Sequence, residues 1–352
     1  MNNIPRRKIT AAVTALNAID SPGPGMAVIR ALREAPEFET RIIGLSYESL
    51  EPGIYMKDMV DKTYQIPYPS AGSDVLFARL KHIHSREKID VIIPNFDSEL
   101  LNFIKISEKL KALGISSFLP TAKQLESRDK ISLYRFCQKH KFNTPKDRII
   151  YKSSEINKAV EELGAPFVVK GKFYEASIAN SVEQAHKEFH RISAKWGTPV
   201  IIQEFVNGIE INISAVGDGK GGLLSVVPMR KLYITDKGKA WAGITLGEED
   251  FVDLAKKFAR ATKWKGGFEL ELIRSQKDAW LYILEVNPRF PSWVYLTVAA
   301  GQNQPSALVK LALNMKVNPY RKYEVGKIFI RYSWDMITDV ETFQKISAYG
   351  EY

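Results

Sequence analysis

The sequence of 352 residues is poor in cysteine and in long apolar runs. Its single cysteine, Cys137, excludes an internal disulfide framework and favours a reducing compartment, so the cytoplasm is the expected location. No apolar run approaches the roughly 20 residues that span a bilayer, so no membrane-spanning helix is expected. The basic start runs through a short apolar stretch into a turn instead of a cleavage site, which favours a first strand over a signal peptide.

Repeats, low-complexity tracts and a Ser/His/Asp hydrolase signature are also absent, and no dense basic run with interleaved aromatic residues occurs. Lysine and arginine number 50 against 40 acids, a net charge of +10. A polyphosphate ligand or an anionic substrate explains this excess as well as a nucleic acid does, and nucleic acid is not favoured. The composition, 45% hydrophobic and 26% charged, is that of a globular protein with two or three packed units.

The first third of the chain alternates between strands and helices. A buried strand at 8–16, a turn with two glycines and a helix from Met26 suggest a Rossmann-like unit. The dinucleotide fingerprint would need a third glycine where the chain has Val28, so the indication for NAD is weak. With segment 55–69 interpreted as a crossover, the alternation predicts a small parallel-sheet domain.

Acidic residues follow the strand that is predicted to end at residue 94. Asp97 and Ser98 are typical N-cap residues, and Glu99 suits the positive first turn of a helix. Ligands of open α/β sheets, however, bind beyond the carboxyl ends of strands, where Asp97 or Glu99 would hold a substrate amine. The sequence leaves both interpretations open.

Segment 266–301 predicts a β-hairpin that carries acids where strands normally avoid them. Alternation places Glu269 and Glu271 on one face of the first strand, and Glu285 and Asn287 on one face of the second. The expected pairing sets Glu271 opposite Glu285 and Glu269 opposite Asn287. In the second strand, the residues 280, 282, 284 and 286 are expected to share the other face.

Opposed carboxylates repel each other by on the order of 4 kcal/mol at ~4 Å and an effective dielectric constant of ~20. A cation between them would relieve this repulsion, and carboxylate and amide oxygens suit Mg²⁺ with phosphates completing its shell. A solvated hairpin face is the alternative. The flanking glycines, the apolar run WLYIL and the Asn-Pro-Arg ending favour the metal site.

Basic residues stand at three further places. Segment 127–140 predicts one helix with Ser127 as its cap and Lys130 in its first turn. Lys170 lies inside an apolar strand, either as a surface residue of an edge strand or as a phosphate-binding residue. Arg230 and Lys231 end another strand before an exposed loop at 235–243.

Together, four segments resemble the ATP-grasp superfamily, closest to its carbamoyl-phosphate-synthetase-like and biotin-carboxylase-like branch. They are RDK (128–130), FVVKGK (167–172), IIQEFVNGIEI (201–211) and FELEL to LYILEVNPRF (268–290). The resemblance implies an α/β chain, with α+β character in the ATP-grasp part. The expected domains are a Rossmann-like pre-ATP-grasp domain at 1–122, a two-lobed ATP-grasp fold at 123–318 with a lid at about 131–202, and an extension at 319–352 packing on the core.

The resemblance also implies a role for each matching position. Lys130 and Lys170 match the lysines that reach the ATP phosphates, and Arg289 matches an arginine on the acyl phosphate or the substrate carboxylate. Arg230 resembles a further phosphate contact. The remaining matches are adenine contacts at Glu204, Phe205 and Val206, the ribose acid Glu210, and the metal ligands Glu271, Glu285 and Asn287, with Glu269 as an alternative ligand.

The activity implied by the resemblance is that of a carboxylate–amine ligase, which uses ATP and Mg²⁺ (or Mn²⁺) to activate a carboxylate as an acyl phosphate. Its substrates would be a small-molecule or peptide carboxylate and an amine, and a homodimer is expected. The loop at 171–179 departs from the family because it has one glycine where a glycine-rich lid is usual. Formation of a carboxy- or carbamoyl-phosphate without an amine acceptor, and a non-catalytic ATP- or peptide-binding module, remain as alternatives.

Overall fold

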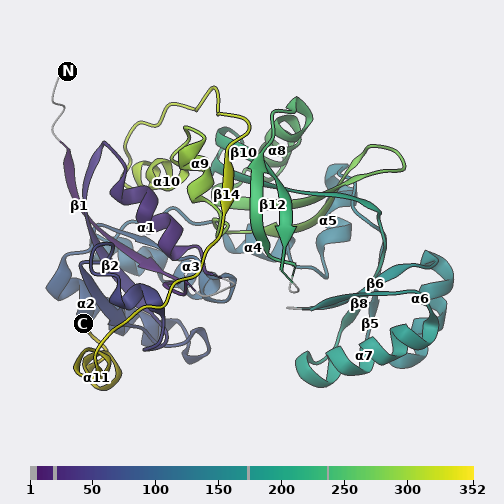
Figure 1. Cartoon of the computed structure of the whole chain (residues 1–352), viewed down its shortest axis with the longest axis horizontal. Coiled ribbons are helices and arrows are strands. Elements are labelled where there is room, and N and C mark those ends of the chain that lie inside the picture. The colour runs from purple at the N-terminus through teal and green to yellow at the C-terminus, as the bar shows by residue number, and fades with distance from the viewer. Residues whose placement is uncertain (1–5, 19–21, 173–174, 236–237) are drawn as a thin grey trace.

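The computed structural model describes residues 6–18, 22–172, 175–235 and 238–352. The chain forms a parallel sheet near the N-terminus, then a small antiparallel sheet and then a long antiparallel sheet. In space the long sheet is in the middle, and the small sheet lies apart from the other two (Figure 1). The α/β class and the Rossmann-like N-terminal unit are therefore confirmed. Within the described residues, no helix has the length and apolar character needed to cross a bilayer.

The N-terminal sheet is parallel throughout and has the strand order β3-β2-β1-β4. Gly25 begins the helix after β1 because the turn passes very close to this strand; a Cβ atom there would lie 2.1 Å from the carbonyl oxygen of Thr14. The elements of this unit are β1 (Arg7–Thr14), α1 (Gly25–Arg33), β2 (Phe38–Ser46), η1 (Pro52–Tyr55), β3 (Lys62–Gln65), η2 (Pro69–Ala71), α2 (Ser73–Glu87), β4 (Val91–Ile93) and α3 (Asp97–Ala112).

Segment 55–69 is more than the predicted crossover, because it contains the strand β3. This strand is only four residues long and has its partners elsewhere in the chain. One edge pairs with β2, and the other pairs with the last residues of the chain, where the amide of Thr63 donates to the carbonyl of Tyr352. Such a strand depends on distant partners and has no periodicity of its own to reveal it.

The central sheet is antiparallel, with the order β13-β12-β9-β10-β11-β14. One face packs on α8 through Phe251, Phe258, Phe268 and Leu270. The other face carries polar side chains, because Glu269 and Glu271 of β12 alternate with the buried leucines. Its elements are β9 (Gly208–Asp218), β10 (Leu223–Ile234), β11 (Ala240–Thr245), α8 (Glu249–Thr262), β12 (Lys265–Ser275), β13 (Leu281–Asn287), α9 (Tyr295–Ala299), α10 (Gln304–Ala312) and β14 (Ile328–Ile330).

The small sheet is antiparallel, with the order β5-β8-β6-β7, and packs against α6 and α7. Two segments that were predicted as loops are partly strands: β7 lies within 171–179, and β11 begins within 235–243. Residues 173, 174, 236 and 237 of these segments lie outside the described ranges. The elements are β5 (Asp147–Ile150), η3 (Ser153–Glu155), α6 (Ile156–Leu163), β6 (Phe167–Gly171), β7 (Ala176–Ala179), α7 (Val182–Trp196) and β8 (Val200–Glu204).

Two short helices, α4 (Ala122–Ser127) and α5 (Leu133–His140), precede the small sheet. The single helix predicted over 127–140 is wrong, because Asp129 forms a turn there. Its carbonyl accepts from the amide of Ser132, and its side chain accepts from the amide of Ile131. Ser127 thus ends α4 and is not a cap, while α5 packs into the core between the central sheet and α8.

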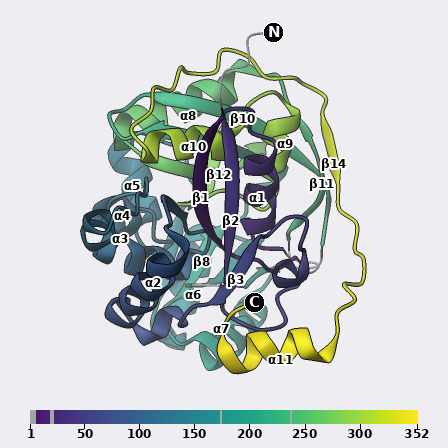
Figure 2. The ribbon, with the colours of Figure 1, turned by 90° about the vertical axis from the view of Figure 1, so that its left-hand side faces the viewer.

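The end of the chain runs as a strap from the central sheet back to the N-terminal sheet (Figure 2). After β14 it leads to α11 (Val340–Tyr349) and then to β3. Two side chains of α2 hold its last residues: Arg79 donates to the carbonyl of Gly350 at 2.8 Å, and Arg86 pairs with Glu351. The strap therefore joins the first and last parts of the chain.

Candidate active site

The acidic hairpin has the predicted pairing. Glu269 lies opposite Asn287, and Glu271 lies opposite Glu285, across β12 and β13. Directly opposed residues of an antiparallel pair project from the same face, so the four polar side chains gather on the face that α8 does not cover.

Beyond Glu285 the prediction for β13 is wrong, because a β-bulge follows. Leu272 pairs with Ile283, so Leu284 is the extra residue of the bulged strand. Ile283 and Val286 are both in the core, whereas Leu284 lines a small pocket with Lys130 and Lys170. The bulge therefore turns one apolar side chain from the core toward the lysines.

Lysines neutralise the opposed acids in this structure. Lys130 Nζ lies 3.3 Å from Glu285 Oε2, while Lys231 Nζ lies 2.6 Å from Glu210 and 3.9 Å from Glu271. Burial lowers the pKa of Lys231, but the carboxylates of Glu271 and Glu210 outweigh it and raise this pKa. For Glu271, burial raises the pKa, but the charges of Lys231, Lys239 and Arg289 and the hydrogen bond from Asn287 together lower it. Both groups are thus held in their charged forms.

Lys231, and not Arg230, faces the acids. Arg230 pairs with Ile211, whose side chain is in the core on the α8 face, so Arg230 projects from the face opposite to the acids. Its side chain is exposed. The prediction that Arg230 contacts phosphate is therefore wrong in this arrangement, because the alternation of β10 brings the next residue to the acids.

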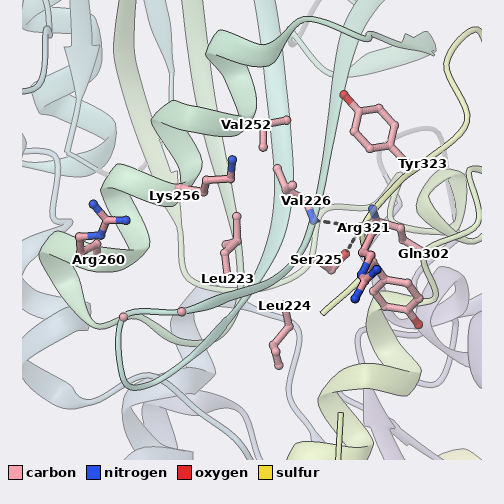
Figure 3. Close-up of a pocket in the computed structure, with 13 residues that line it drawn as sticks. Leu223, Leu224, Ser225, Val226, Val252, Lys256, Arg260, Gln302, Arg321 and Tyr323 are labelled. Atoms are coloured by element: carbon pink, nitrogen blue, oxygen red, sulfur yellow. Dashed lines mark hydrogen bonds between the residues drawn. The ribbon is translucent and has the colours of Figure 1, made fainter. Parts of the chain in front are cut away.

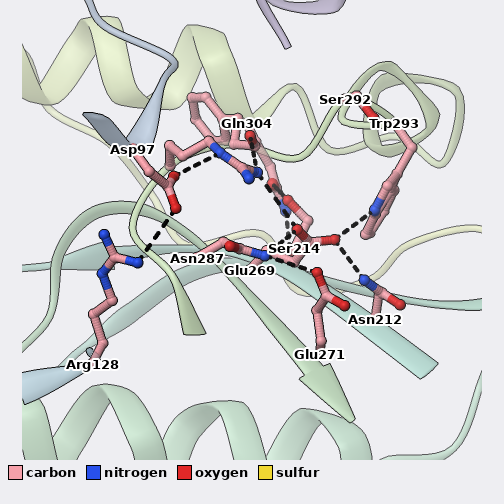
Figure 4. Close-up of polar contacts among 12 residues, drawn as sticks. Asp97, Arg128, Asn212, Ser214, Glu269, Glu271, Asn287, Ser292, Trp293 and Gln304 are labelled. Atoms are coloured by element: carbon pink, nitrogen blue, oxygen red, sulfur yellow. Dashed lines mark hydrogen bonds and ion pairs between the residues drawn. The ribbon is translucent and has the colours of Figure 1, made fainter. Parts of the chain in front are cut away.

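Glu269 is buried and has its oxygens engaged (Figure 4). Oε1 accepts from Asn212 Nδ2 at 2.7 Å and from Trp293 Nε1 at 2.8 Å, and Oε2 accepts from Asn287 Nδ2 at 3.0 Å. Burial and the neighbouring charge of Glu271 raise the pKa of Glu269. Glu269 therefore positions Asn287, and Glu271 is the better candidate for a metal ligand. Trp293 also belongs to this network.

Asp97 is held between two arginines (Figure 4). Its Oδ1 lies 2.9 Å from Arg289 Nε, and its Oδ2 accepts from Arg128 Nη1 at 3.3 Å. Arg289 also lies 3.7 Å from Glu269. Despite its burial, these carboxylates raise the pKa of Arg289. The carboxylate of Asp97 thus orients the arginines instead of standing ready for a substrate amine.

Glu99 does not contact a substrate, because it is fully buried and its oxygens are engaged. It accepts from Thr14 Oγ1 at 2.5 Å, from the amides of Asn95 and Phe96, and from the Tyr47 hydroxyl. Burial raises its pKa. The N-cap of α3 is Phe96 and not Asp97 or Ser98, and Glu99 satisfies the free amide at this helix start. The substrate role predicted for Glu99 is wrong.

Lys130 and Lys170 converge on the pocket that Leu284 lines. Lys170 belongs to β6, which pairs with β7 on one side and β8 on the other, so the edge-strand interpretation is excluded. Its Nζ donates to Gln203 Oε1 at 2.6 Å. Burial and the charge of Lys130 lower the pKa of Lys170. Two cations that are held close together form a place where an anion is stabilised.

The segment expected to contact adenine, Glu204 to Val206, joins β8 to β9 and hence the small sheet to the central sheet. All three of its side chains are half-buried. Glu204 Oε2 accepts from the amide of Lys146 at 3.1 Å, and the amide of Glu204 donates to the carbonyl of Lys146. Glu210, the expected ribose acid, lies on the polar face of β9 in the ion pair with Lys231.

Arg331 comes from the strap and was not singled out in the sequence. It donates to Ser292 Oγ at 2.6 Å, and its Nε is buried without a hydrogen-bond partner. Burial lowers its pKa to about 10, with Glu269 opposing. Its only sequence signal is a charge directly after the apolar run at 328–330, and the fold alone reveals that this run forms β14 and borders the site.

The donor set fits a hard divalent cation that shares its shell with phosphates. Among the described residues no three His, Cys, Asp or Glu side chains form a metal cluster. Mg²⁺, however, usually takes one or two carboxylates and completes its shell with substrate phosphates and water. Glu271 and Glu285 face each other, Asn287 adjoins them, and the buried Oδ1 of Asn212 on this face has no partner. Glu271, Glu285 and Asn287 are therefore suitable residues.

The chain was compared with family models, with curated proteins and with solved structures. Residues 127–292 match the family model of an ATP-grasp domain. The carbamoyl phosphate synthase large chain of Clostridium botulinum (strain Kyoto / Type A2) is 24% identical over 274 residues, covering 74% of this chain and 24% of that protein. The same enzyme chain of Neisseria gonorrhoeae is 28% identical over 172 residues, covering 45% of this chain and 16% of that protein. The chain thus spans about a quarter or less of these relatives.

Solved structures share the fold over most of the chain. An N5-carboxyaminoimidazole ribonucleotide synthetase in complex with ADP superposes with a TM-score of 0.68 at 15% identity, covering 91% of this chain and 81% of that one. Biotin carboxylase from Campylobacter jejuni gives 0.69 at 16% identity, covering 92% and 75%. The family match shows that residues 127–292 form an ATP-grasp domain, and the solved structures show that the fold of the chain is that of ATP-grasp enzymes.

Proposed function

We propose that the protein is an ATP-dependent ligase that activates a carboxylate as an acyl phosphate for attack by an amine. The observation that carries this proposal is the meeting of two lysines with two opposed carboxylates: Lys130 and Lys170 share one small pocket, and Lys130 also pairs with Glu285. A metal-bound polyphosphate needs both kinds of group within a few ångströms of each other.

In this proposal Lys130 and Lys170 bind the phosphates of ATP. Glu271, Glu285 and Asn287 hold Mg²⁺ or Mn²⁺, which when bound neutralises charge on the phosphates. Lys130 and Lys231 now neutralise Glu285 and Glu210, respectively, so these cations would shift toward the phosphates when ATP and metal arrive. The adenine would contact Glu204, Phe205 and Val206, and the ribose would contact Glu210, whose side chain is 44% exposed.

The proposed reaction has two steps. An oxygen of the substrate carboxylate attacks the γ-phosphorus of ATP, the bond to the β,γ-bridging oxygen breaks, and ADP leaves. The amine nitrogen then attacks the acyl carbon, phosphate leaves and the nitrogen loses a proton. Arg289 would orient the carboxylate, because its planar guanidinium suits a carboxylate and Asp97 fixes its direction. Lys170 would stabilise the charge of the transferring phosphoryl group.

Release of ADP, measured over a matrix of carboxylates and amines, tests the proposal. The expected result is ADP release that requires a matched pair, with an amide as product. Glu285→Gln should abolish this release without changing the thermal unfolding temperature by more than a few degrees. Glu108→Gln is the matched control, because Glu108 is an exposed acid on α3. Undiminished ADP release in Glu285→Gln would overturn the assignment of the metal ligands.

Two alternatives make different forecasts in the same assay. A carboxy- or carbamoyl-phosphate-forming enzyme would release ADP without an amine acceptor; the names of the relatives favour this candidate. A non-catalytic ATP- or peptide-binding module would bind nucleotide and release no ADP with any substrate pair.

The oligomeric state and the cellular location of the chain are also open to a proposal. A structural neighbour is a biotin carboxylase domain dimer, and we propose a homodimer and a cytoplasmic location for this chain. Light scattering of the purified chain tests the first: a mass of one chain, 39.8 kDa, at micromolar concentration would reject it.

A further inference from the structure

A cavity of about 380 Å³ lies beside the first half of β10 (Figure 3). Along this half β10 pairs with β9, but β11 pairs with β10 only from Met229 onward. One edge of residues 223–228 therefore has no neighbouring strand. The cavity is at the opposite end of β10 from Lys231, the residue that reaches the acids, and none of its lining residues belongs to the candidate active site.

Side chains and a crossing segment satisfy the hydrogen-bonding groups of this open edge. The amide of Val226 donates to Gln302 Oε1 at 3.0 Å, and the Ser225 hydroxyl donates to the same oxygen at 2.5 Å. The carbonyl of Leu224 accepts from the amide of Tyr320. Because these edge groups have partners, the cavity is poorly suited to a peptide that would bind by adding a strand.

Three cationic side chains surround the opening of the cavity. Lys256 and Arg260 project from α8, and Arg321 projects from the segment on the other side (Figure 3). No lining residue is acidic. Lys256 pairs with the exposed Asp253, but no described carboxylate forms an ion pair with Arg260 or Arg321.

The spacing of these cations is a further reason to expect an anion at this opening. Lys256 and Arg260 are four residues apart on one helix face, an arrangement in which like charges destabilise the helix. An anion between α8 and the crossing segment would relieve this repulsion and neutralise Arg321. Beneath the charges, Leu223, Leu224 and Val226 of β10 and Val252 of α8 provide an apolar wall.

We propose that this cavity binds a small organic anion, a phosphate or carboxylate group on an apolar body, at a site separate from the nucleotide. Lys256 and Arg260 on one side and Arg321 on the other give the rim a positive charge that attracts the anionic group, and the apolar wall holds the body. Its volume is within the range of small-molecule sites, about 300–1,000 Å³.

Fluorescence titration with 8-anilinonaphthalene-1-sulfonate, an aromatic body with one anionic group, tests the site in the full chain without nucleotide. The expected result is saturable binding that weakens at least tenfold in the double variant Arg260→Gln/Arg321→Gln. The double variant Lys277→Gln/Lys345→Gln removes the same charge from exposed positions elsewhere and should bind as the unmodified chain does. Equal affinity in all three proteins would overturn the proposal.

Competition then identifies the anionic group. Displacement of the dye by phenyl phosphate assigns phosphate esters, and displacement by benzoate assigns carboxylates. Displacement by neither, or an equal effect of inorganic phosphate alone, would overturn the requirement for an apolar body and with it the proposal. Because no ATP is present, these outcomes do not depend on whether the ligase proposal holds.

Discussion

Lys231 Nζ lies 3.9 Å from Glu271 Oε2, with Glu210 of the intervening strand β9 also bound to the lysine at 2.6 Å. This relationship explains how the polar face of the central sheet tolerates a group of acids. The side chain of Lys231 is only 8% exposed, so its charge acts at close range and with little screening by salt.

Lys231→Gln should therefore lower the free energy of unfolding by roughly 1.5–3 kcal/mol at pH 7, the range for hydrogen bonds to charged groups. The pKa of Glu271 is lowered from 4.5 and that of Lys231 is raised from 10.5. The stabilisation from Glu271 is present above pH 4.5 and is lost as pH falls through its lowered pKa. The stabilisation from Lys231 is present below pH 10.5 and is lost as pH rises through its raised pKa.

Urea unfolding at several pH values checks this prediction. The difference between the unmodified chain and the variant should be full near pH 7 and should shrink below pH 4.5. A difference that persists unchanged at pH 3 would mean that Lys231 stabilises the fold by packing and not by charge.

Asp97 and Arg289 should be energetically coupled. A double-mutant cycle with Asp97→Asn and Arg289→Gln should give an interaction energy of about 0.5–3 kcal/mol, because the two side chains form one ion pair at 2.9 Å. Denaturant unfolding of the four proteins measures it. Additive effects would show that Arg289 does not depend on Asp97 for its position.

The bulge in β13, which places Leu284 beside the two lysines, leads to a separate prediction. Leu284→Glu places a carboxylate beside Lys130 and Lys170, where it would compete with phosphate, so ATP should bind at least tenfold more weakly. Ile283→Val alters the neighbouring core residue and should cost about 0.5–1.5 kcal/mol of stability with little effect on ATP binding. Calorimetric titration with ATP and Mg²⁺ compares them, and equal affinities would contradict the proposed phosphate site.

Cys137 should be unreactive in the folded protein. Burial raises the pKa of its thiol to about 12, so almost no thiolate is present at pH 8. A chromogenic disulfide reagent should label no thiol in the native chain and one thiol in denaturant. Stability should fall as pH rises above 9.0, the ordinary pKa of this group, because only the unfolded thiol then ionises readily.

The sequence was most informative where one local pattern determined the structure. Strict alternation predicted which residues of the acidic hairpin face each other, and the pairing of Glu271 with Glu285 is confirmed. Alternation could not reveal the bulge at Leu284, because a bulge changes the period within one strand. Its position depends on packing against residues from other elements.

Other errors have the same origin in distant contacts. Arg230 and Lys231 are adjacent, and only the register with β9 decides which of them faces the acids. Glu99 looked available because acids at helix starts are common, whereas its partners Thr14 and Tyr47 come from β1 and the end of β2. The family resemblance identified residue types and their order, but not which of them were already paired with each other.

The strap has a mechanical consequence. It connects the central sheet to β3, so the last part of the chain links the N-terminal unit to the central sheet. The backbone enters the small sheet after Thr144, whose hydroxyl donates to the carbonyl of Ile283, and leaves it through the segment after Glu204. These connections run side by side where Lys146 and Glu204 exchange hydrogen bonds, which makes them a two-stranded hinge. We therefore expect the small sheet, which carries Lys170, to rotate about these two segments more easily than the N-terminal unit moves against the central sheet.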